Sequence, residues 1–306
     1  LLRAAREARR MGATVVRTAE LPHLLPLALA AGWVRHCPVV MSVHNDWEPR
    51  SRYGAEDQLL YGNPRVRRLL ERLLYPLVDE AWPVFPGWGE VARRRGLPSC
   101  RIRHFPHGID LTRFRTAPPR GYLDRFGAGG RPVVAWAARL AKDTFADQIP
   151  EIIARVREAG QDALFVVAGR GQAEEAIRLE IRSRGLDGDV RFLGFIPRDE
   201  VPWLVSAADV NLCPYGGYTT LEMLASAKPL VVYDVGWNRD VVRDAETGLM
   251  APAGDAAACA ERIVWALHHP EEARRIGAQA RAWAFEHHGL ERVQEIKAGM
   301  YRKLLS

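Results

Sequence analysis

Two stretches of the chain carry residues whose types and spacing suit the binding of a phosphorylated ligand. In one of them an apolar run ends at Pro214, Gly216 and Gly217 predict a tight turn, and a helical pattern begins near Thr219. The N–H groups at a helix start, together with the helix dipole, attract anions. Glycines let a phosphate approach the backbone closely. This stretch therefore predicts an anion site at the start of a helix.

The role of Glu222 in this helix is open between two interpretations. Thr219 and Glu222 have the Thr-x-x-Glu spacing of a capping box, in which the glutamate folds back onto the N–H of the cap residue. A glutamate in the first turn repels phosphate but suits a ribose diol, as acidic residues do in dinucleotide-binding folds. The spacing alone does not choose between a structural and a ribose-binding glutamate.

The second stretch contains Arg139 and Lys142, which follow an apolar run and lie three residues apart. Open α/β sheets bind ligands at the carboxyl ends of their strands. Two fixed cations at such an end can neutralise a diphosphate leaving group without a metal. A solvated helix start is the alternative interpretation. Lysine is rare in this chain, since 39 of the 43 basic residues are arginine, and its use here slightly favours binding.

The elements that must position these residues alternate along the chain. Short β-branched runs are separated by amphipathic helical stretches, a rhythm typical of parallel α/β architecture. The predicted strands are 13–17, 38–44, 80–85 and 101–105 in the first half, and 132–136, 163–168, 190–193, 209–213 and 230–233 in the second. Predicted helices cover 149–156, 173–184, 255–268 and 270–286.

Length and composition indicate two domains. The 306 residues, 48% of them hydrophobic, are enough for two cores. The stretch 116–130 is rich in proline and glycine, so we place the linker there and expect domains at 1–120 and 121–290 and a C-terminal helix at 291–306. The first half offers four strands where a nucleotide-binding half usually has five or six, and it begins at Leu1. We therefore expect that its opening strands are missing.

The composition excludes several classes of protein. The apolar fraction excludes disorder, and four cysteines scattered singly exclude a disulfide scaffold and indicate a reducing compartment. The longest mostly apolar run, 21–34, is about 14 residues and too short to span a bilayer. The arginines recur throughout helices without a finger motif or an aromatic-interleaved strand, which argues against nucleic acid.

Charge is divided unevenly along the chain. Residues 1–125 carry a net charge of +9, and residues 126–306 a net charge of −3. In the basic half, the stretch 64–78 predicts a helix with Arg65, Arg68 and Arg72 on one stripe and leucines on the other side. Such a helix can lie on anionic lipid. A domain helix with a solvated arginine face is the alternative interpretation.

Several of these pieces, taken in order, resemble a known family. The second half resembles the donor-binding domain of retaining glycosyltransferases of family 4. Three segments carry this resemblance: ARLAK, FVVAGRGQAEEAIRLEIRSRGLDGDVRFLGFIPRDEVPWLVSAADVNLCP and TTLEMLASAKPLVVYDVGWNRDVVRDAETGLM. The first half resembles the acceptor side more weakly, through PVVMSVHNDW and FPHGIDLTRF. The resemblance implies the α/β GT-B fold, in which two Rossmann-like parallel-sheet domains face each other across a cleft, here with the first domain incomplete.

The resemblance also assigns roles to individual residues. Arg139 would hold the donor diphosphate, with Lys142 assisting, Glu222 would bind the ribose, and Phe195 would bracket the base. His44 would face the donor sugar, and His107 would lie on the acceptor or sugar side. The remaining donor-binding residues would surround the phosphates at the helix start: Gly216, Gly217, Tyr218, Thr219 and Thr220.

The chain departs from the family pattern at several of these positions. Pro214 stands where the first glutamate of the family's Glu-(seven residues)-Glu motif is expected, and Thr144 where a lysine is expected. His107 replaces the usual asparagine of the Pro-Asn-Gly segment, and Trp237 and Asn238 follow Gly236, where a small residue is common. These departures leave the identity of the sugar open.

The implied reaction is transfer of a sugar from a nucleoside-diphosphate sugar to a glycan or lipid-linked acceptor, with retention at the anomeric carbon. No carboxylate pair is evident at the site, so a front-face route fits better than a double displacement. The resemblance implies no cofactor and no metal. Asp187-Gly188-Asp189 has the Asp-x-Asp pattern of metal-dependent transferases, but its glycine turn before a predicted strand favours a structural role.

We expect a cytoplasmic protein, peripheral to the inner face of the membrane if the basic helix binds lipid. Two alternatives remain open. A GT-B-fold sugar-nucleotide epimerase shares the cleft, but the Arg-Leu and Thr-Thr-Leu-Glu elements disfavour it. A non-catalytic sugar-nucleotide-binding remnant is favoured by the absent first glutamate, by the displaced lysine and by the short first half.

Overall fold

The computed structural model describes residues 2–19, 24–44, 64–114 and 116–306. They form two compact units. The first unit contains the described residues up to 44, residues 64–108 and the C-terminal segment Glu291–Ser306; the second is Ile109–Leu290. No helix in the described ranges is both long and apolar enough to cross a membrane.

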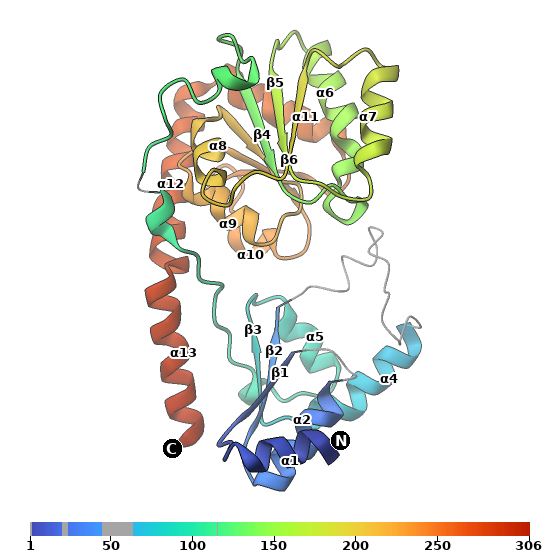
Figure 1. The fold of residues 1–306 in the computed structure, drawn as a ribbon, viewed down its shortest axis with the longest axis vertical. Helices are drawn as coiled ribbons and strands as arrows, with labels where there is room; N and C mark the ends of the chain where they lie inside the picture. The colour runs from blue at the N-terminus through green and yellow to red at the C-terminus, as the bar shows by residue number, and fades with distance from the viewer. Residues whose placement is uncertain (1, 20–23, 45–63, 115) are drawn as a thin grey trace. The chain divides into compact units, whose positions relative to one another are not determined.

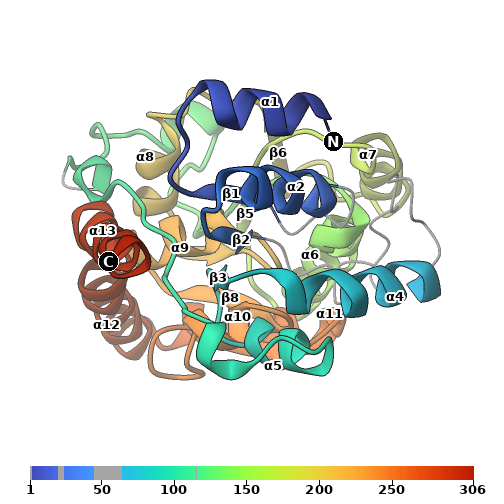
Figure 2. The same cartoon turned by 90° about the horizontal axis from the view of Figure 1, so that it is seen from below.

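The first unit is built on a parallel three-stranded sheet in the order β1-β2-β3. Its strands are β1 (Val16–Ala19), β2 (Val39–Val43) and β3 (Glu80–Pro83). Its helices are α1 (Leu2–Arg10), α2 (Leu25–Arg35), α4 (Pro64–Leu74), α5 (Trp88–Arg94) and, from the end of the chain, α13 (Leu290–Leu305). Figure 2 shows α1 and α2 side by side, in agreement with their contacts.

One expected strand of this unit is replaced by an irregular segment. Residues 101–105, predicted as a strand, follow a short 3-10 turn (Ser99–Arg101) and make only an isolated bridge between Ile102 and Ala81. The N–H groups of Arg103 and Phe105 still donate to carbonyls of β3. The segment therefore runs along β3 without forming a regular ladder, so the prediction of a strand was wrong.

The second unit contains a parallel six-stranded sheet in the order β6-β5-β4-β7-β8-β9. Its strands are β4 (Val133–Ala137), β5 (Leu164–Ala168), β6 (Val190–Gly194), β7 (Val210–Leu212), β8 (Leu230–Asp234) and β9 (Leu249–Pro252). The first five match the expected strands, whereas the short, proline-ended β9 was not predicted. This order is that of the doubly wound dinucleotide-binding fold. The expected α/β class with parallel sheets is confirmed.

Helices cover both faces of this sheet. They are α6 (Ile149–Glu158), α7 (Glu174–Ser183), α8 (Val201–Ala207), α9 (Tyr218–Ala225), α10 (Asn238–Val241), α11 (Ala256–His268) and α12 (Pro270–His288). Helix α6 packs against α7 and α11, and α9 packs against α8 and α12, so two helix layers sandwich the strands (Figure 1). The four predicted helices are present, and the predicted apolar face of α6 is buried.

The stretch predicted as the linker, 116–130, lies inside the second unit. Tyr122 and Ala128 are buried in one core cluster with residues of β4, β5 and α8, and Phe126 packs against it. Aromatic side chains that bury this way anchor a segment to a core. The boundary between the two compact units lies instead between Gly108 and Ile109.

Candidate functional site

The candidate site of the second unit lies at the carboxyl ends of β4 and β7. These strands are hydrogen-bonded neighbours, and from them the chain proceeds in opposite directions, to β5 and β6 on one side and to β8 and β9 on the other. Such a topological switch point opens a crevice where open α/β sheets bind ligands. The loops that follow β4 and β7 contain the two stretches singled out from the sequence.

Arg139 lies in the turn that follows β4. Its Nη2 donates to both carboxylate oxygens of Asp143, at 2.7 and 2.6 Å. The Asp143 side chain is 5% exposed, whereas that of Arg139 is 45% exposed. A guanidinium has five N–H groups, so the buried carboxylate fixes one edge of the arginine while other donors remain available for a phosphate. Sequence reasoning missed Asp143, although its position four residues after Arg139 in one turn was a usable signal.

The two residues around Asp143 have different surroundings. Lys142 is exposed. Burial raises the pKa of Asp147, and the charge of Lys142 offsets part of this rise. Thr144 is buried, and its hydroxyl contacts the carbonyls of Arg139 and Ala141 at 2.7 and 2.8 Å. The position where the family has a lysine therefore holds a turn-stabilising hydroxyl, and Lys142 is the nearby ammonium that faces solvent.

The loop after β5 holds the Arg139 turn in place. The N–H of Leu140 donates to the carbonyl of Arg170, and the N–H of Ala173 donates to that of Leu140, both at 3.0 Å. A Cβ on Gly171 would lie 2.0 Å from the Leu140 carbonyl oxygen, so only glycine allows the two loops to approach this closely. Gly171 thus acts on the arginine through the backbone.

The glycine pair after β7 forms the predicted tight turn. A Cβ on Gly216 would lie 2.0 Å from the sulfur of Cys213, and Gly217 has a φ of +57°. Gly217 is the N-cap of α9, which begins at Tyr218, and no side-chain cap hydrogen bond is present at this helix start. Of the two interpretations of Glu222, the capping box with Thr219 is therefore wrong, because the helix begins before Thr219.

The two threonines at this start differ in accessibility. Thr219 is half-buried, whereas Thr220 is fully buried, and its hydroxyl donates to the side-chain Oδ1 of Asn238 at 3.4 Å. The Asn238 amide also donates to the carbonyls of Pro214 and Tyr233. Thr220 and Asn238 therefore hold the loop together from inside, and the side chain of Thr220 is directed away from solvent.

Glu222 is paired with an arginine that sequence reasoning missed. Nη1 of Arg113 donates to Oε1 of Glu222 at 3.2 Å, and the two side chains are 16% and 18% exposed. Burial raises the pKa of Glu222, and Arg113 and Arg198 offset this rise only in part. Charge pairing favours the ionised carboxylate, which is the form that accepts hydrogen bonds from a diol. Because 109 residues separate the partners, no local pattern could reveal the pair.

Two aromatic side chains in the segments that follow β6 and β7 are open to solvent. Phe195, directly after β6, is 80% exposed, and Tyr218, at the start of α9, is 52% exposed. Exposed rings at strand ends are suitable surfaces for stacking with a base. The position predicted to bracket a nucleotide base is thus accessible.

The first unit brings its two predicted site residues together. His44 follows β2, and its ring centroid lies 5.5 Å from that of His107 and 6.4 Å from that of Phe105. His44 is exposed, whereas His107 is 8% exposed. His107 therefore supports the ring of His44 from the buried side. Residues 45–47, which complete the motif after His44, lie outside the described residues.

The Asp-x-Asp pattern lies at the opposite end of the strands. Asp189 precedes β6 and pairs with Arg131 and Arg157 at 3.0 and 3.3 Å. Within the described ranges, no group of three or more His, Cys, Asp or Glu side chains is arranged to hold a metal ion. The structural interpretation of Asp187–Asp189 is consistent with these ion pairs.

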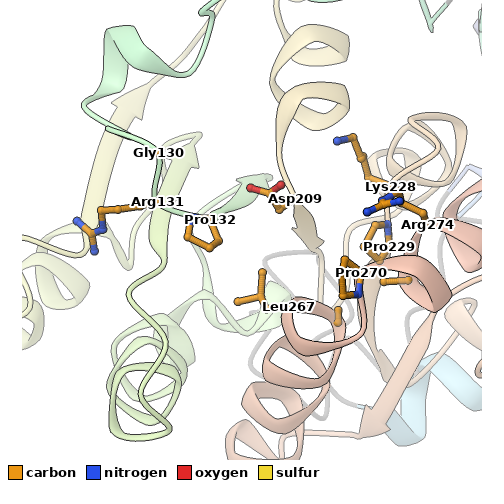
Figure 3. A pocket seen from close by; sticks show the side chains of 11 residues that line it. Gly130, Arg131, Pro132, Asp209, Lys228, Pro229, Leu267, Pro270 and Arg274 are labelled. Carbon is orange, nitrogen blue, oxygen red and sulfur yellow. The ribbon is translucent and has the colours of Figure 1, made fainter.

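A pocket of about 260 Å³ also lies at the amino ends of the strands (Figure 3). Among its lining residues are Arg131, Asp209, Lys228 and Arg274. Figure 3 shows the Arg131 guanidinium directed away from the pocket, and Asp209 accepts the N–H of Val133 at 2.8 Å. Two of its charged groups are thus engaged in holding the sheet, and the pocket shares no residue with the switch-point site.

The family of the chain follows from comparison with known proteins. The model of glycosyl transferases group 1 matches residues 125–283, which include the whole switch-point site. The chain belongs to the group 1 glycosyl transferases. A second model, glycosyltransferase family 4, matches residues 1–113 of this group 1 glycosyl transferase.

Curated relatives of this group 1 glycosyl transferase act on different sugars. The α-D-kanosaminyltransferase of Streptomyces kanamyceticus is 26% identical over 70% of the chain and 58% of the relative. The 2-deoxystreptamine glucosyltransferase of the same organism is 28% identical over 77% of the chain and 66% of the relative. The chain thus spans less than two thirds of the length of these relatives.

Solved structures share the fold of this group 1 glycosyl transferase. Anabaena Alr3699/HepE, in complex with UDP and glucose, has a TM-score of 0.81 at 17% identity and covers 98% of this chain and 81% of that one. Sucrose-phosphate synthase from Thermosynechococcus elongatus has a TM-score of 0.79 at 22% identity and covers 98% and 75%. These similarities confirm the GT-B fold.

Proposed function

We propose that this protein transfers a sugar from a nucleoside-diphosphate sugar to a glycan or lipid-linked acceptor, with retention at the anomeric carbon. The observation that carries the proposal is the convergence of Arg139 and the glycine-preceded start of α9 at the switch point between β4 and β7. UDP and glucose bound to the structurally similar Alr3699/HepE support a nucleotide-sugar donor.

The groups at this edge are suited to stabilise a leaving diphosphate. When the bond between the anomeric carbon and the diphosphate breaks, the electron pair leaves with the diphosphate and its charge increases. Arg139, Lys142 and the N–H groups at the start of α9 supply positive potential there. Because these cations can offset the charge by themselves, we propose that transfer needs no metal; chelation by EDTA should leave turnover unchanged.

Retention is proposed to follow a front-face route. The acceptor hydroxyl forms the new bond on the face that the diphosphate leaves, and its proton passes to a diphosphate oxygen. His44, exposed and supported by His107, is proposed to position the donor sugar or the acceptor. Analysis of the anomeric configuration of the product by NMR tests this part, and an inverted product contradicts it.

A second candidate function is a sugar-nucleotide-binding protein without catalysis. The observation that favours it is the absence of a carboxylate at Pro214, together with the buried hydroxyl of Thr144 where the family has a lysine. A donor-hydrolysis assay separates the two functions: slow release of free sugar identifies an enzyme, and nucleotide binding without release identifies the binding protein.

Calorimetry with UDP, GDP and ADP tests the donor site. Arg139→Ala should weaken binding of the preferred nucleotide by at least about a hundredfold, because it removes two charge-assisted hydrogen bonds that are each worth roughly 1.5–3 kcal/mol. Arg155→Ala is a matched control, since Arg155 forms an exposed pair with Glu151 on α6. If the intact protein binds no nucleotide, the donor-site proposal is wrong.

We also propose a cytoplasmic protein that contacts anionic membrane through α4. Four apolar side chains of α4 and the following turn are exposed, Val66, Leu69, Leu73 and Leu77. Arg65, Arg68 and Arg72 are exposed on the same helix, and such basic amphipathic surfaces favour anionic lipid. Sedimentation with phosphatidylglycerol vesicles should recover the protein, and Leu69→Ser with Leu73→Ser should release it. Equal recovery of this double variant would contradict the contact.

A further inference from the structure

The arginine that pairs with Glu222 comes from a part of the second unit that is distant in sequence. Arg113 lies in the 3-10 turn Leu111–Phe114, and its guanidinium makes three polar contacts. Nη1 donates to Glu222 at 3.2 Å, Nη2 donates to the carbonyl of Arg198, and Nε lies 3.8 Å from Asp199. One side chain therefore joins α9 to the loop that follows β6.

The backbone that carries Arg113 is held on both sides. Before it, Asp110 accepts a hydrogen bond of 3.0 Å from the N–H of Thr112. After it, Phe114 is 4% exposed and its carbonyl accepts a hydrogen bond of 3.1 Å from Arg281 of α12. An arginine on a fixed backbone loses little further freedom when it pairs, and its planar fork orients its partner.

The pairing leaves half of the glutamate for a ligand. Arg113 contacts Oε1 of Glu222, and within the described residues no hydrogen bond reaches Oε2. Arg113 and Arg198 are the cations that lower the pKa of Glu222 against the larger effect of burial. Burial raises the pKa of the Cys213 thiol, and the charge of Glu222 adds to this rise. An oriented carboxylate with one available oxygen is suited to accept a hydrogen bond from a ribose hydroxyl.

We infer that Arg113 is a positioning residue for the donor nucleotide: it holds Glu222 oriented toward the ribose and fixes the loop that carries Phe195 relative to it. This inference rests on the proposed function, because it assumes that a nucleotide occupies the switch-point site. Arg113 does not bind the nucleotide itself in this account. It acts through Glu222 and through the carbonyl of Arg198.

The test compares each ribonucleotide with its 2′-deoxy form by calorimetry. In the wild-type protein the ribonucleoside diphosphate should bind at least about tenfold more tightly than the 2′-deoxy form, as a charge-assisted hydrogen bond predicts. Arg113→Met should bring this ratio close to one. Arg113→Lys, which keeps a charged donor, should restore part of it.

Two control variants separate positioning from stability. Arg125 pairs with Glu200 at the same distance of 3.2 Å in the same unit, so Arg125→Met should leave the ratio unchanged. Arg139→Ala should weaken both nucleotides equally and keep the ratio. A general loss of structure also weakens both nucleotides together, and thermal unfolding identifies it.

Three outcomes would overturn the inference. An unchanged ratio in a folded Arg113→Met protein assigns Arg113 to structure alone. Tighter nucleotide binding by this variant would show that Arg113 competes with the nucleotide for the site. Absence of nucleotide binding by the wild-type protein overturns the proposed function as well, whereas the first two outcomes leave the proposed function intact.

Discussion

The two units place their candidate residues after the strands of parallel sheets, but they stabilise those sheets differently. In the second unit, β5 is entirely buried and β4 and β8 nearly so, and all three are almost wholly apolar. In the first unit, the buried strand β3 begins with Glu80, which accepts a hydrogen bond of 2.8 Å from Trp82 and pairs with Arg103. Apolar burial tolerates small changes, whereas a buried charge depends on its partner.

A second buried pair strengthens this contrast. Arg95 and Glu71 lie 2.8 Å apart, with their side chains 9% and 10% exposed. The arginine-rich composition of the first half is thus partly internal. The difference teaches that the excess of arginine in this unit has at least two uses, since some guanidiniums are exposed on α4 and others hold the core.

The largest expected effect is the loss of the buried pair. Glu71→Gln removes the carboxylate that lies 2.8 Å from the buried Arg95 and should lower the free energy of unfolding by about 3–5 kcal/mol. Glu90→Gln is the matched control, since Glu90 pairs with exposed Arg93 and Arg94, and solvent-exposed ion pairs contribute little to stability. Urea unfolding measures both. Equal costs would show that the buried pair stabilises the first unit no more than an exposed pair does.

The next effect concerns the backbone approach in the second unit. Gly171→Ala places a Cβ against the Leu140 carbonyl, so it should cost about 1–3 kcal/mol in stability and weaken nucleotide binding by displacing the Arg139 turn. Gly188→Ala, whose Cβ would meet no atom within 4 Å, is the control. Thermal unfolding and calorimetry measure the two effects. A Gly171→Ala protein with wild-type affinity would show that this loop does not position Arg139.

A smaller effect distinguishes the roles of the two units. His44→Ala should reduce turnover by about tenfold, as the loss of roughly one hydrogen bond predicts, and leave nucleotide affinity unchanged. His268→Ala, an exposed histidine of the second unit, should change neither. Steady-state kinetics and calorimetry measure the two quantities. A loss of nucleotide affinity in His44→Ala would assign the histidine to donor binding instead.

The smallest expected effect is a difference in alkylation rate among the four cysteines, which reports how closed the two cores are. In the second unit, burial raises the pKa of Cys213 and of Cys259 to about 12, so their thiolates are scarce at pH 8. In the first unit, Cys100 is exposed, and burial raises the pKa of Cys37. Iodoacetamide should label Cys100 first and Cys37 more slowly. Mass spectrometry that finds rapid labelling of Cys213 would contradict a closed second core.

Much of the fold was predictable because it is encoded locally. Short, mostly apolar runs predicted β4, β5, β6, β7 and β8 within one or two residues. The segment 101–105 failed because its backbone bonds to β3 at only some positions, which depends on its packing rather than on its own residue types. Proline-ended β9 carried too weak a pattern for prediction.

The sequence by itself determined which residue types stand at the ends of which strands, including the glycine pair before α9 and the cations after β4. Only the tertiary structure decided which of them meet. It paired Arg113 with Glu222 and turned Thr220 inward, and it placed the loops of β4 and β7 at one switch point. Local periodicity arises from neighbours along the chain, whereas these pairings depend on strand order and loop paths that join distant residues.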